Sequence, residues 1–221
     1  MHRFLITLLI IVALTPALNA QETEESSWSF NYMMQLAQAE VQSIEGYEQP
    51  ETNATGTPLA APWLHLQRFF GDPAVLQHGI RFGIGYVNNG SQALMSGSPI
   101  EIRAKAIVVP LQVLFTARPA QEISNNIGLS VAVGPYVSFI VDHDYLTMPG
   151  VSIAGSNRVL PDVTSRPRIG LIADLAATWT LSDTRNLSLG YRFMEDQTWF
   201  DMADIRWAVG GVFLAIEGPA F

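Results

Sequence analysis

The sequence predicts an all-β protein, a single antiparallel up-and-down transmembrane β-barrel of eight strands that follows a cleaved signal peptide. Three observations lead to this prediction. Eight segments alternate apolar with small or polar residues, the longer connections fall between alternate pairs of segments, and the polar side of the alternation carries few charges. With 221 residues and 48% apolar content, the chain suits one large β domain.

The N-terminus has the composition of a secretory signal peptide. A short basic start is followed by an apolar run from Phe4 to Leu14 and then by small residues, which favour cleavage after Ala20 or Ala17. The apolar run is shorter than the roughly 20 residues of a membrane-spanning helix. The expected parts are a signal peptide at 1–20, a mobile acidic segment at 21–26 and the barrel domain at 27–221.

Each expected strand is a segment in which apolar side chains recur at every second residue. In GLSVAVGPYVSF, residues 128–139, the odd-numbered positions are apolar and the even-numbered ones are mostly Gly, Ser and Ala. The same alternation begins at Trp28 and recurs along the remaining segments, although the last one is mostly apolar on both sides. The segments are 27–39, 63–70, 78–87, 99–115, 128–139, 169–181, 186–193 and 205–216.

Two segments contain local features that predict geometry. The triplet Asn88-Asn89-Gly90 has turn composition and predicts that the third strand ends there. In residues 99–115 the charged positions Glu101, Arg103 and Lys105 share their parity with the apolar positions from Ile107 onwards. Since a period-two face changes sides only where a residue is inserted, we expect a β-bulge or break near Ala106.

The connections between the segments differ in length in a regular way. The first, third, fifth and seventh connections are the longer ones, at 42–61, 88–98, 142–167 and 195–204. Long connections at one end and short turns at the other, with an even number of strands, are typical of an outer-membrane barrel whose termini both face the periplasm.

Composition excludes several other classes of protein. The formal net charge is −8 and there is a single lysine, so we expect no nucleic-acid partner. The chain has no cysteine, which excludes disulfides, thiolate metal sites and cysteine nucleophiles. We expect no cofactor and no metal site.

The residues opposite the apolar side indicate which side meets lipid. They are mostly Gly, Ser, Ala and Thr rather than the dense Lys, Glu and Asp of a water-facing surface, which favours a narrow filled lumen. The expected polar network of the lumen consists of Arg81, Glu101, Arg103, Asp174 and Arg192. The expected lipid-facing positions include Ile84, Leu129, Val131, Leu171 and Leu189.

Two neighbouring segments resemble a known family. KAIVVPLQVLFTA, with Pro110, and GLSVAVGPYVSF, with Gly134-Pro135-Tyr136, resemble consecutive strands of the porin-like bacterial outer-membrane β-barrel proteins. The resemblance covers about residues 105–140, and the rest of the chain is similar by pattern alone. It implies a barrel of the outer membrane and an assembly signal at the C-terminal aromatic Phe221, although Gly218-Pro219 interrupts the last strand before it.

Catalytic chemistry has few candidates in the sequence. Asp142-His143-Asp144 is the only tight group of acid–base residues, and three adjacent residues of an extended chain do not point to one centre. Ser138 and His143 are an odd number of residues apart, which places them on opposite faces of a regular strand and argues against a dyad. We therefore expect no catalytic residue.

These observations predict a small, non-enzymatic barrel of the Gram-negative outer membrane with a structural or loop-mediated binding role. Its expected partners are outer-membrane lipid and the barrel-assembly machinery, and its expected form is a monomer. A plugged lumen is favoured over a narrow pore, because an eight-stranded barrel is only wide enough for side chains to fill. The alternative is a soluble periplasmic or secreted barrel of the lipocalin type that binds an apolar ligand. Side-chain direction distinguishes the two, because a soluble barrel turns its apolar parity inward.

Overall fold

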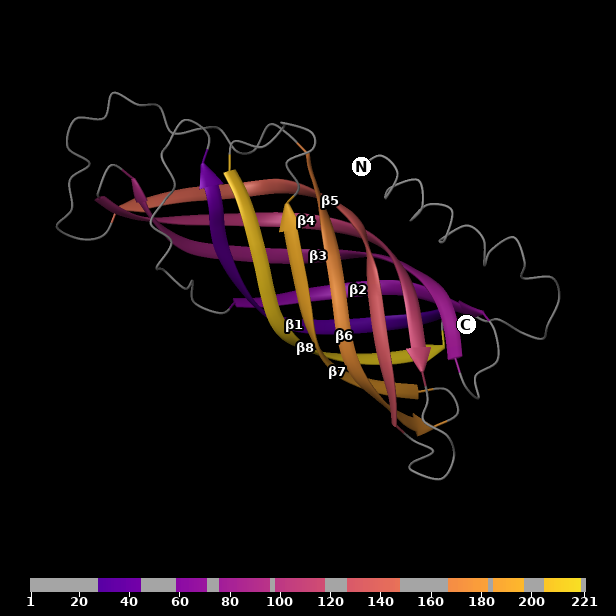
Figure 1. Cartoon of the computed structure of the whole chain (residues 1–221). Helices are drawn as coiled ribbons and strands as arrows, with labels where there is room; N and C mark the ends of the chain where they lie inside the picture. Colours follow the sequence, from indigo (N-terminus) through magenta and orange to yellow (C-terminus); the bar gives the residue numbers. More distant parts are fainter. Residues whose placement is uncertain are drawn as a thin grey trace.

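A computed structural model describes eight β-strands and the residue that precedes the sixth (Figure 1). The strands are β1 (Trp28–Ile44), β2 (Leu59–Phe70), β3 (Leu76–Met95), β4 (Ser98–Ala117), β5 (Ile127–Thr147), β6 (Arg168–Ser182), β7 (Arg185–Asp196) and β8 (Ile205–Pro219). The described residues are those of the strands and Pro167. The expected signal peptide, the segment 21–26 and Phe221 lie outside them. No helix among the described residues is long and apolar enough to cross a membrane.

The strands form one closed antiparallel barrel in chain order. Each strand pairs with the next, and β1 pairs with β8, so β1 begins and β8 ends at the same end of the barrel (Figure 1). We call this the terminal end and the other the far end. Following paired residues once around from Trp28 leads back to β1 at Gln38, a stagger of ten residues. Such a stagger tilts the strands by about 40° and leaves an interior that side chains can fill.

The bulge expected near Ala106 is present, but the inserted residue is on the neighbouring strand. The β4–β5 register shifts between Lys105 and Ala106, where β5 contributes Val141 as the extra residue. The pairing of β4 with β3 has the same register throughout, so β4 does not change faces. Its odd-numbered residues point outward along the described side chains, and the charged Arg103 and Lys105 simply lie beyond the apolar part of that face.

The third connection is shorter than we expected. Asn88-Asn89-Gly90 does not turn the chain, because these residues pair with Lys105, Ala104 and Arg103. The strands β3 and β4 continue until only two residues separate Met95 from Ser98. Pairing with β4 therefore keeps these residues in a strand despite their turn-like composition. The prediction that all four connections at the far end are long was wrong for this one.

The prolonged strands form a three-stranded sheet at the far end. Within the described strands, β3 pairs with β2 only as far as Gly85, and β5 pairs with β6 only as far as Ser138. Beyond these residues both strands pair with β4 alone. We call this part of β3, β4 and β5 the projecting sheet; it extends past the start of β2 in Figure 1.

Prolines produce the local irregularity that we expected around Pro135. The β4–β5 pairing is interrupted opposite Pro135, between Pro110–Tyr136 and Val113–Val133, with no shift of register. Proline has no N–H to donate to the ladder, which accounts for such a gap. Pro110 lies within a similar gap in the β3–β4 pairing, between Phe82–Leu111 and Gly85–Val108. The ladder therefore loses bonds at two places without any side chain changing faces.

Candidate functional site

An ion pair between neighbouring strands lies at the centre of the barrel interior. Asp174 of β6 and Arg192 of β7 are paired residues whose side chains both point inward and are buried. Arg192 donates from Nε to Asp174 Oδ1 and from Nη2 to Asp174 Oδ2, both at 2.7 Å. This two-pronged geometry is the strong form of the arginine–carboxylate pair.

Arg81 connects this ion pair to the opposite wall. It reaches across the interior from β3 and donates from Nη1 to Asp174 Oδ2 at 3.0 Å. Its neighbours in the sheet complete the link: Arg81 Nε donates to Gln67 Oε1 at 3.0 Å, and Gln112 Nε2 donates to Asp174 Oδ2 at 3.2 Å. One carboxylate therefore receives hydrogen bonds from three strands.

An aromatic group covers the other side of Arg192. Its guanidinium lies 4.2 Å from the ring centroid of Trp63, and its Nη2 is 3.3 Å from His65 Nε2. The rings of Trp63 and His65 are stacked, with centroids 5.9 Å apart, and Trp63 Nε1 donates to Gln35 Oε1 at 3.1 Å. A guanidinium held over a tryptophan face in a dry interior is stabilised by cation–π attraction. We refer to Gln35, Trp63, His65, Gln67, Arg81, Gln112, Asp174 and Arg192 as the central network.

The central network leaves little free space in the lumen. A cavity of about 10 Å³ lies on its terminal side, lined in part by Asn31, Arg81, Ser130, Asp174 and Ser188. This volume has room for about one water molecule. Around it, Ser130, Thr178 and Ser188 form a chain of hydroxyl contacts at 3.2 and 2.8 Å.

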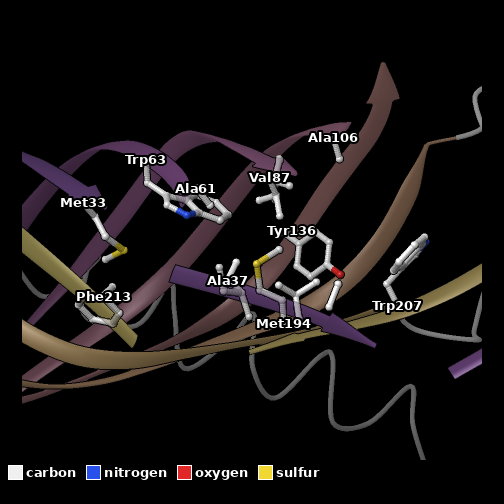
Figure 2. Close-up of a cluster of buried hydrophobic side chains, with 14 of the residues drawn as sticks. Met33, Ala37, Ala61, Trp63, Val87, Ala106, Tyr136, Met194, Trp207 and Phe213 are labelled. Carbon is white, nitrogen blue, oxygen red and sulfur yellow. The ribbon is translucent and has the colours of Figure 1, made fainter. Parts of the chain in front are cut away.

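On the far side of the central network the interior is apolar. Met194, Trp207 and Tyr136 fill it together with small residues such as Ala37 and Ala106 (Figure 2). These residues belong to one buried apolar cluster, of which Met33, Ala176, Phe213 and Ala215 line the cavity on the terminal side. The whole cluster consists of Met33, Ala37, Ala39, Ala61, Trp63, Val87, Ala104, Ala106, Val108, Tyr136, Ile140, Ile172, Ala176, Met194, Trp207, Val209, Phe213 and Ala215. It gives the barrel a packed core on the inside, in place of an open channel.

A second polar group secures the far end of this core. Asp196 accepts a hydrogen bond from Tyr136 Oη at 2.8 Å and one from the Trp207 backbone N–H at 3.1 Å. Arg168 Nη1 lies 3.4 Å from the same carboxylate. The side chain of Tyr136 passes over Gly170, where a Cβ would collide with its ring. The group joins four strands, β5 to β8, where the long chain segments leave the barrel.

The residues expected in the lumen are only partly brought together. Arg81, Asp174 and Arg192 meet in the central network. Arg103 does not: it is exposed on the outward side of β4, so its assignment to the lumen was wrong. The error came from assuming that the β4 face changes sides. The side chain of Glu101 lies outside the described part.

Other members of the central network were not recognised from the sequence. Gln35, Trp63, His65, Gln67 and Gln112 all point inward. Their parity carried the signal, since each is separated by an even number of residues from other inward positions of its own strand. What parity does not reveal is which of them touch across the barrel.

The outward side of the wall is apolar. All five positions expected to face lipid are exposed there: Ile84, Leu129, Val131, Leu171 and Leu189, at 36 to 54%. The other exposed large apolar residues are Tyr32, Met34, Leu36, Leu64, Leu76, Phe82, Tyr86, Val109, Leu111, Phe115, Ile127, Phe139, Val141, Leu175, Leu181, Tyr191, Phe193, Val212, Leu214 and Ile216. They come from all eight strands, so the apolar surface surrounds the barrel.

The acid–base group on β5 is affected by the bulge. Asp142 lies outside the barrel, where it accepts a hydrogen bond from Lys105 Nζ at 2.6 Å. His143 pairs with Ala104, and because the inserted Val141 lies between Ser138 and His143, the argument from odd spacing does not apply. The two are still not a dyad, because four pair positions along a strand separate them by about 13 Å. Among the described residues, no group of three His, Cys, Asp or Glu could hold a metal ion.

Comparisons with known proteins find similar folds at low sequence identity. Neisserial surface protein A is 12% identical, with a TM-score of 0.48 over 90% of this chain and 99% of that one. The outer membrane protein OprG from Pseudomonas aeruginosa is 11% identical, with a TM-score of 0.42 over 89% and 98%. The outer membrane protease OmpT from Escherichia coli is 5% identical, with a TM-score of 0.45 over 90% and 99%. No protein-family model and no curated protein sequence matches the chain. At these identities the likeness concerns barrel architecture alone.

Proposed function

We propose that this chain is an integral barrel of the Gram-negative outer membrane with a plugged lumen, and that it has a structural or binding role rather than an enzymatic one. The observation that carries the proposal is the apolar outward surface that surrounds the barrel. Apolar patches on soluble monomers are limited in area, and a continuous belt from all eight strands has no counterpart among them.

The height of this belt agrees with the proposal. On β1 the outward apolar residues run from Trp28 to Leu36 and rise by about 20 Å at about 3.3 Å per residue and a tilt of about 40°, close to the apolar height of about 25 Å in outer-membrane barrels. Polar outward residues border it at both ends. Arg68 and Arg185 lie at the terminal end, and Asn88 and Lys105 lie at the far end.

The polarity of the wall counts against the soluble lipocalin-type alternative. A soluble barrel needs polar side chains outside and apolar ones inside. Here leucine and valine cover the outside, while two arginines and an aspartate occupy the middle of the inside. An apolar ligand would have to displace the central network to enter from the terminal end.

The same network supports a plugged, non-catalytic interior. Asp174 is buried and both of its oxygens accept hydrogen bonds from arginine, so this carboxylate is held within the central network and away from bulk solvent. The adjoining cavity holds about one water molecule. Any binding role then falls to the far end, where the projecting sheet and the longest connections leave the barrel. We also propose that the barrel is a monomer, because the pairing of β1 with β8 closes the sheet within one chain.

A charge placed in the middle of the belt tests the proposal. Leu189 lies mid-belt and Leu181 lies at the terminal end, and both are exposed. In a bilayer, Leu189→Arg should lower the unfolding free energy by about 2–4 kcal/mol, and Leu181→Arg by about 0–1 kcal/mol. Urea unfolding in lipid vesicles, followed by tryptophan fluorescence, measures both.

A soluble barrel would give the opposite result. An outward arginine would then be harmless at either position, since both sites would face water. Equal, small effects of the two substitutions, together with no heat-dependent change in electrophoretic mobility, would refute the membrane assignment.

A further inference from the structure

A cluster of aromatic and basic side chains lies on the outer wall at the terminal end. The Arg68 guanidinium carbon is 5.8 Å from the ring centroid of Trp28 and 5.4 Å from that of Phe70. The rings of Phe70 and His78 are 5.9 Å apart. All four side chains are half-buried on the outward side of β1, β2 and β3. We call Trp28, Arg68, Phe70 and His78 the interfacial cluster.

The pairing of the strands places the interfacial cluster at the edge of the apolar belt. Trp28 is paired with Arg68, and Phe70 with His78, so the four residues form two adjacent rungs of the sheet. The next outward positions towards the middle of the barrel are apolar, with Leu66 and Leu64 on β2. A lipid headgroup whose acyl chains lay on these leucines would be level with the interfacial cluster.

The rings hold the cationic group of the interfacial cluster in place. Contact with two aromatic rings restricts the Arg68 guanidinium, and a further edge-to-face contact between Trp28 and Phe82, at 5.6 Å and 76°, fixes the indole. A planar guanidinium matches the geometry of phosphate oxygens better than an ammonium does.

The surrounding charge favours an anion. On the outward face at the terminal end, the described strands carry Arg68, His78 and Arg185 but no Asp or Glu. Of the acidic side chains on the described strands, the one nearest this end, Glu217, points inward, where it accepts hydrogen bonds from Ser29 and Asn186. Basic groups at a bilayer surface attract anionic lipid.

We propose that the interfacial cluster is a headgroup site for an anionic phospholipid in the leaflet at the terminal end. Arg68 and His78 contact the phosphate, Trp28 and Phe70 contact the glycerol region, and Leu66 and Leu64 contact the acyl chains. This inference rests on the proposed membrane location. It adds a preferred lipid at one defined position of the wall.

The proposed site is tested by measuring which phospholipid stays bound to the protein. The protein is placed in nanodiscs containing equal amounts of phosphatidylcholine and phosphatidylglycerol with identical acyl chains. The lipids that stay bound after release into detergent are counted by native mass spectrometry. The native chain should retain phosphatidylglycerol in preference to phosphatidylcholine. Arg68→Gln should reduce the retained ratio by about fivefold, the effect of one basic group at an anionic surface.

Matched variants separate the site from general charge. Arg185→Gln removes a positive charge at the same end, on β7, where no aromatic ring contact is found among the described residues, and it should leave the ratio unchanged. Arg68→Lys keeps the charge but loses the planar guanidinium, so its ratio should lie between those of the native chain and Arg68→Gln.

The outcomes distinguish this inference from the proposed function. Heat-dependent electrophoretic mobility first establishes that each variant forms a barrel. If the native barrel folds and inserts but shows no preference for phosphatidylglycerol, the lipid site alone is overturned. An equal fall in the retained lipid ratio in Arg68→Gln and Arg185→Gln also overturns it. A native chain that does not insert overturns both proposals.

Discussion

Arg192 has no exposed surface and contacts residues of β2 and β6, so its environment shows how the interior tolerates charge. A buried guanidinium is costly unless a carboxylate and further hydrogen bonds compensate it. Asp174 supplies the carboxylate, and Trp63 and His65 cover the remaining faces. Two arginines share this one aspartate, which makes Asp174 the residue on which both depend.

Removing the shared carboxylate should be strongly destabilising. Asp174→Ala leaves Arg81 and Arg192 buried without their partner, and we expect the unfolding free energy to fall by about 3–5 kcal/mol. Asp142→Ala breaks the exposed pair with Lys105 and should cost less than about 1 kcal/mol. Urea titrations of both variants in lipid vesicles measure the difference. Similar losses in the two variants would mean that the central network has no special role in stability.

A glycine under Trp63 offers a second test at single-residue resolution. A Cβ at Gly85 would collide with the Trp63 ring, whereas a Cβ at Gly218 would meet nothing within 4 Å. Gly85→Ala must therefore move the indole away from Arg192 and Gln35, at a cost of about 1–3 kcal/mol. Gly218→Ala should be close to neutral. Unfolding midpoints and the tryptophan emission spectrum report the two effects, and an unchanged spectrum in Gly85→Ala would contradict the expected displacement.

At the scale of the element, β5 is the strand with the most unusual construction. It has the inserted Val141, the Pro135 gap, and a last part that pairs with β4 alone. The inserted residue determines which face of the sheet each later residue of β5 occupies. This makes the strand sensitive to deletions in one place and tolerant of them in another.

Two single-residue deletions in β5 should have opposite outcomes. Deleting Val141 removes only the extra residue, so Ile140 and Asp142 can keep their partners Ala106 and Lys105. Deleting Val137 instead moves Phe139 into the inward place of Ser138, where a buried serine now lies. We expect the first variant to fold in normal yield and the second to lose most of it, as measured by the heat-sensitive fraction on electrophoresis. Equal yields would argue against the observed register.

The existence and order of all eight strands were predictable from the sequence, because every strand turns one side to apolar surroundings over most of its length. The far end of β3 was not. Beyond Val87 the outward face is no longer apolar, so the alternation becomes weak and Asn88-Asn89-Gly90 suggests a turn. The bulge was predicted at the right level and on the wrong strand, because the pattern of β4 contains no information about where β5 has its extra residue.

At the scale of the whole molecule, the interior has the central network in its middle, mostly apolar side chains on the far side of that network, and a second polar group at the far end. Alternation in the sequence predicts that small and polar residues point inward, and Arg81, Asp174 and Arg192 were recognised in this way. The contacts among them depend on the ten-residue stagger of the barrel, which brings Arg81 of β3 close enough in height to reach Asp174 of β6. No pattern within one strand specifies that stagger, so the central network could be predicted as a set of residues but not as a set of contacts.

The filled lumen should not conduct ions. We expect no stepwise current from the native protein in planar lipid bilayers, because the central network crosses the lumen, the apolar cluster packs beside it, and the cavity next to the network has room for only about one water molecule. Replacing both members of the ion pair, in Asp174→Ser with Arg192→Ser, removes charge and volume together and should produce measurable conductance. Channels of equal size in the native protein and the double variant would contradict a plugged interior.

The projecting sheet also has a practical consequence. Only two residues separate Met95 from Ser98, and the paired strands behind them continue directly from the barrel wall. A peptide grafted between β3 and β4 would therefore be carried on a stiff, hydrogen-bonded stalk at a fixed distance from the membrane surface. Antibody access to such a graft would depend on the length of the stalk rather than on the flexibility of a loop, which suits the barrel to use as a display scaffold.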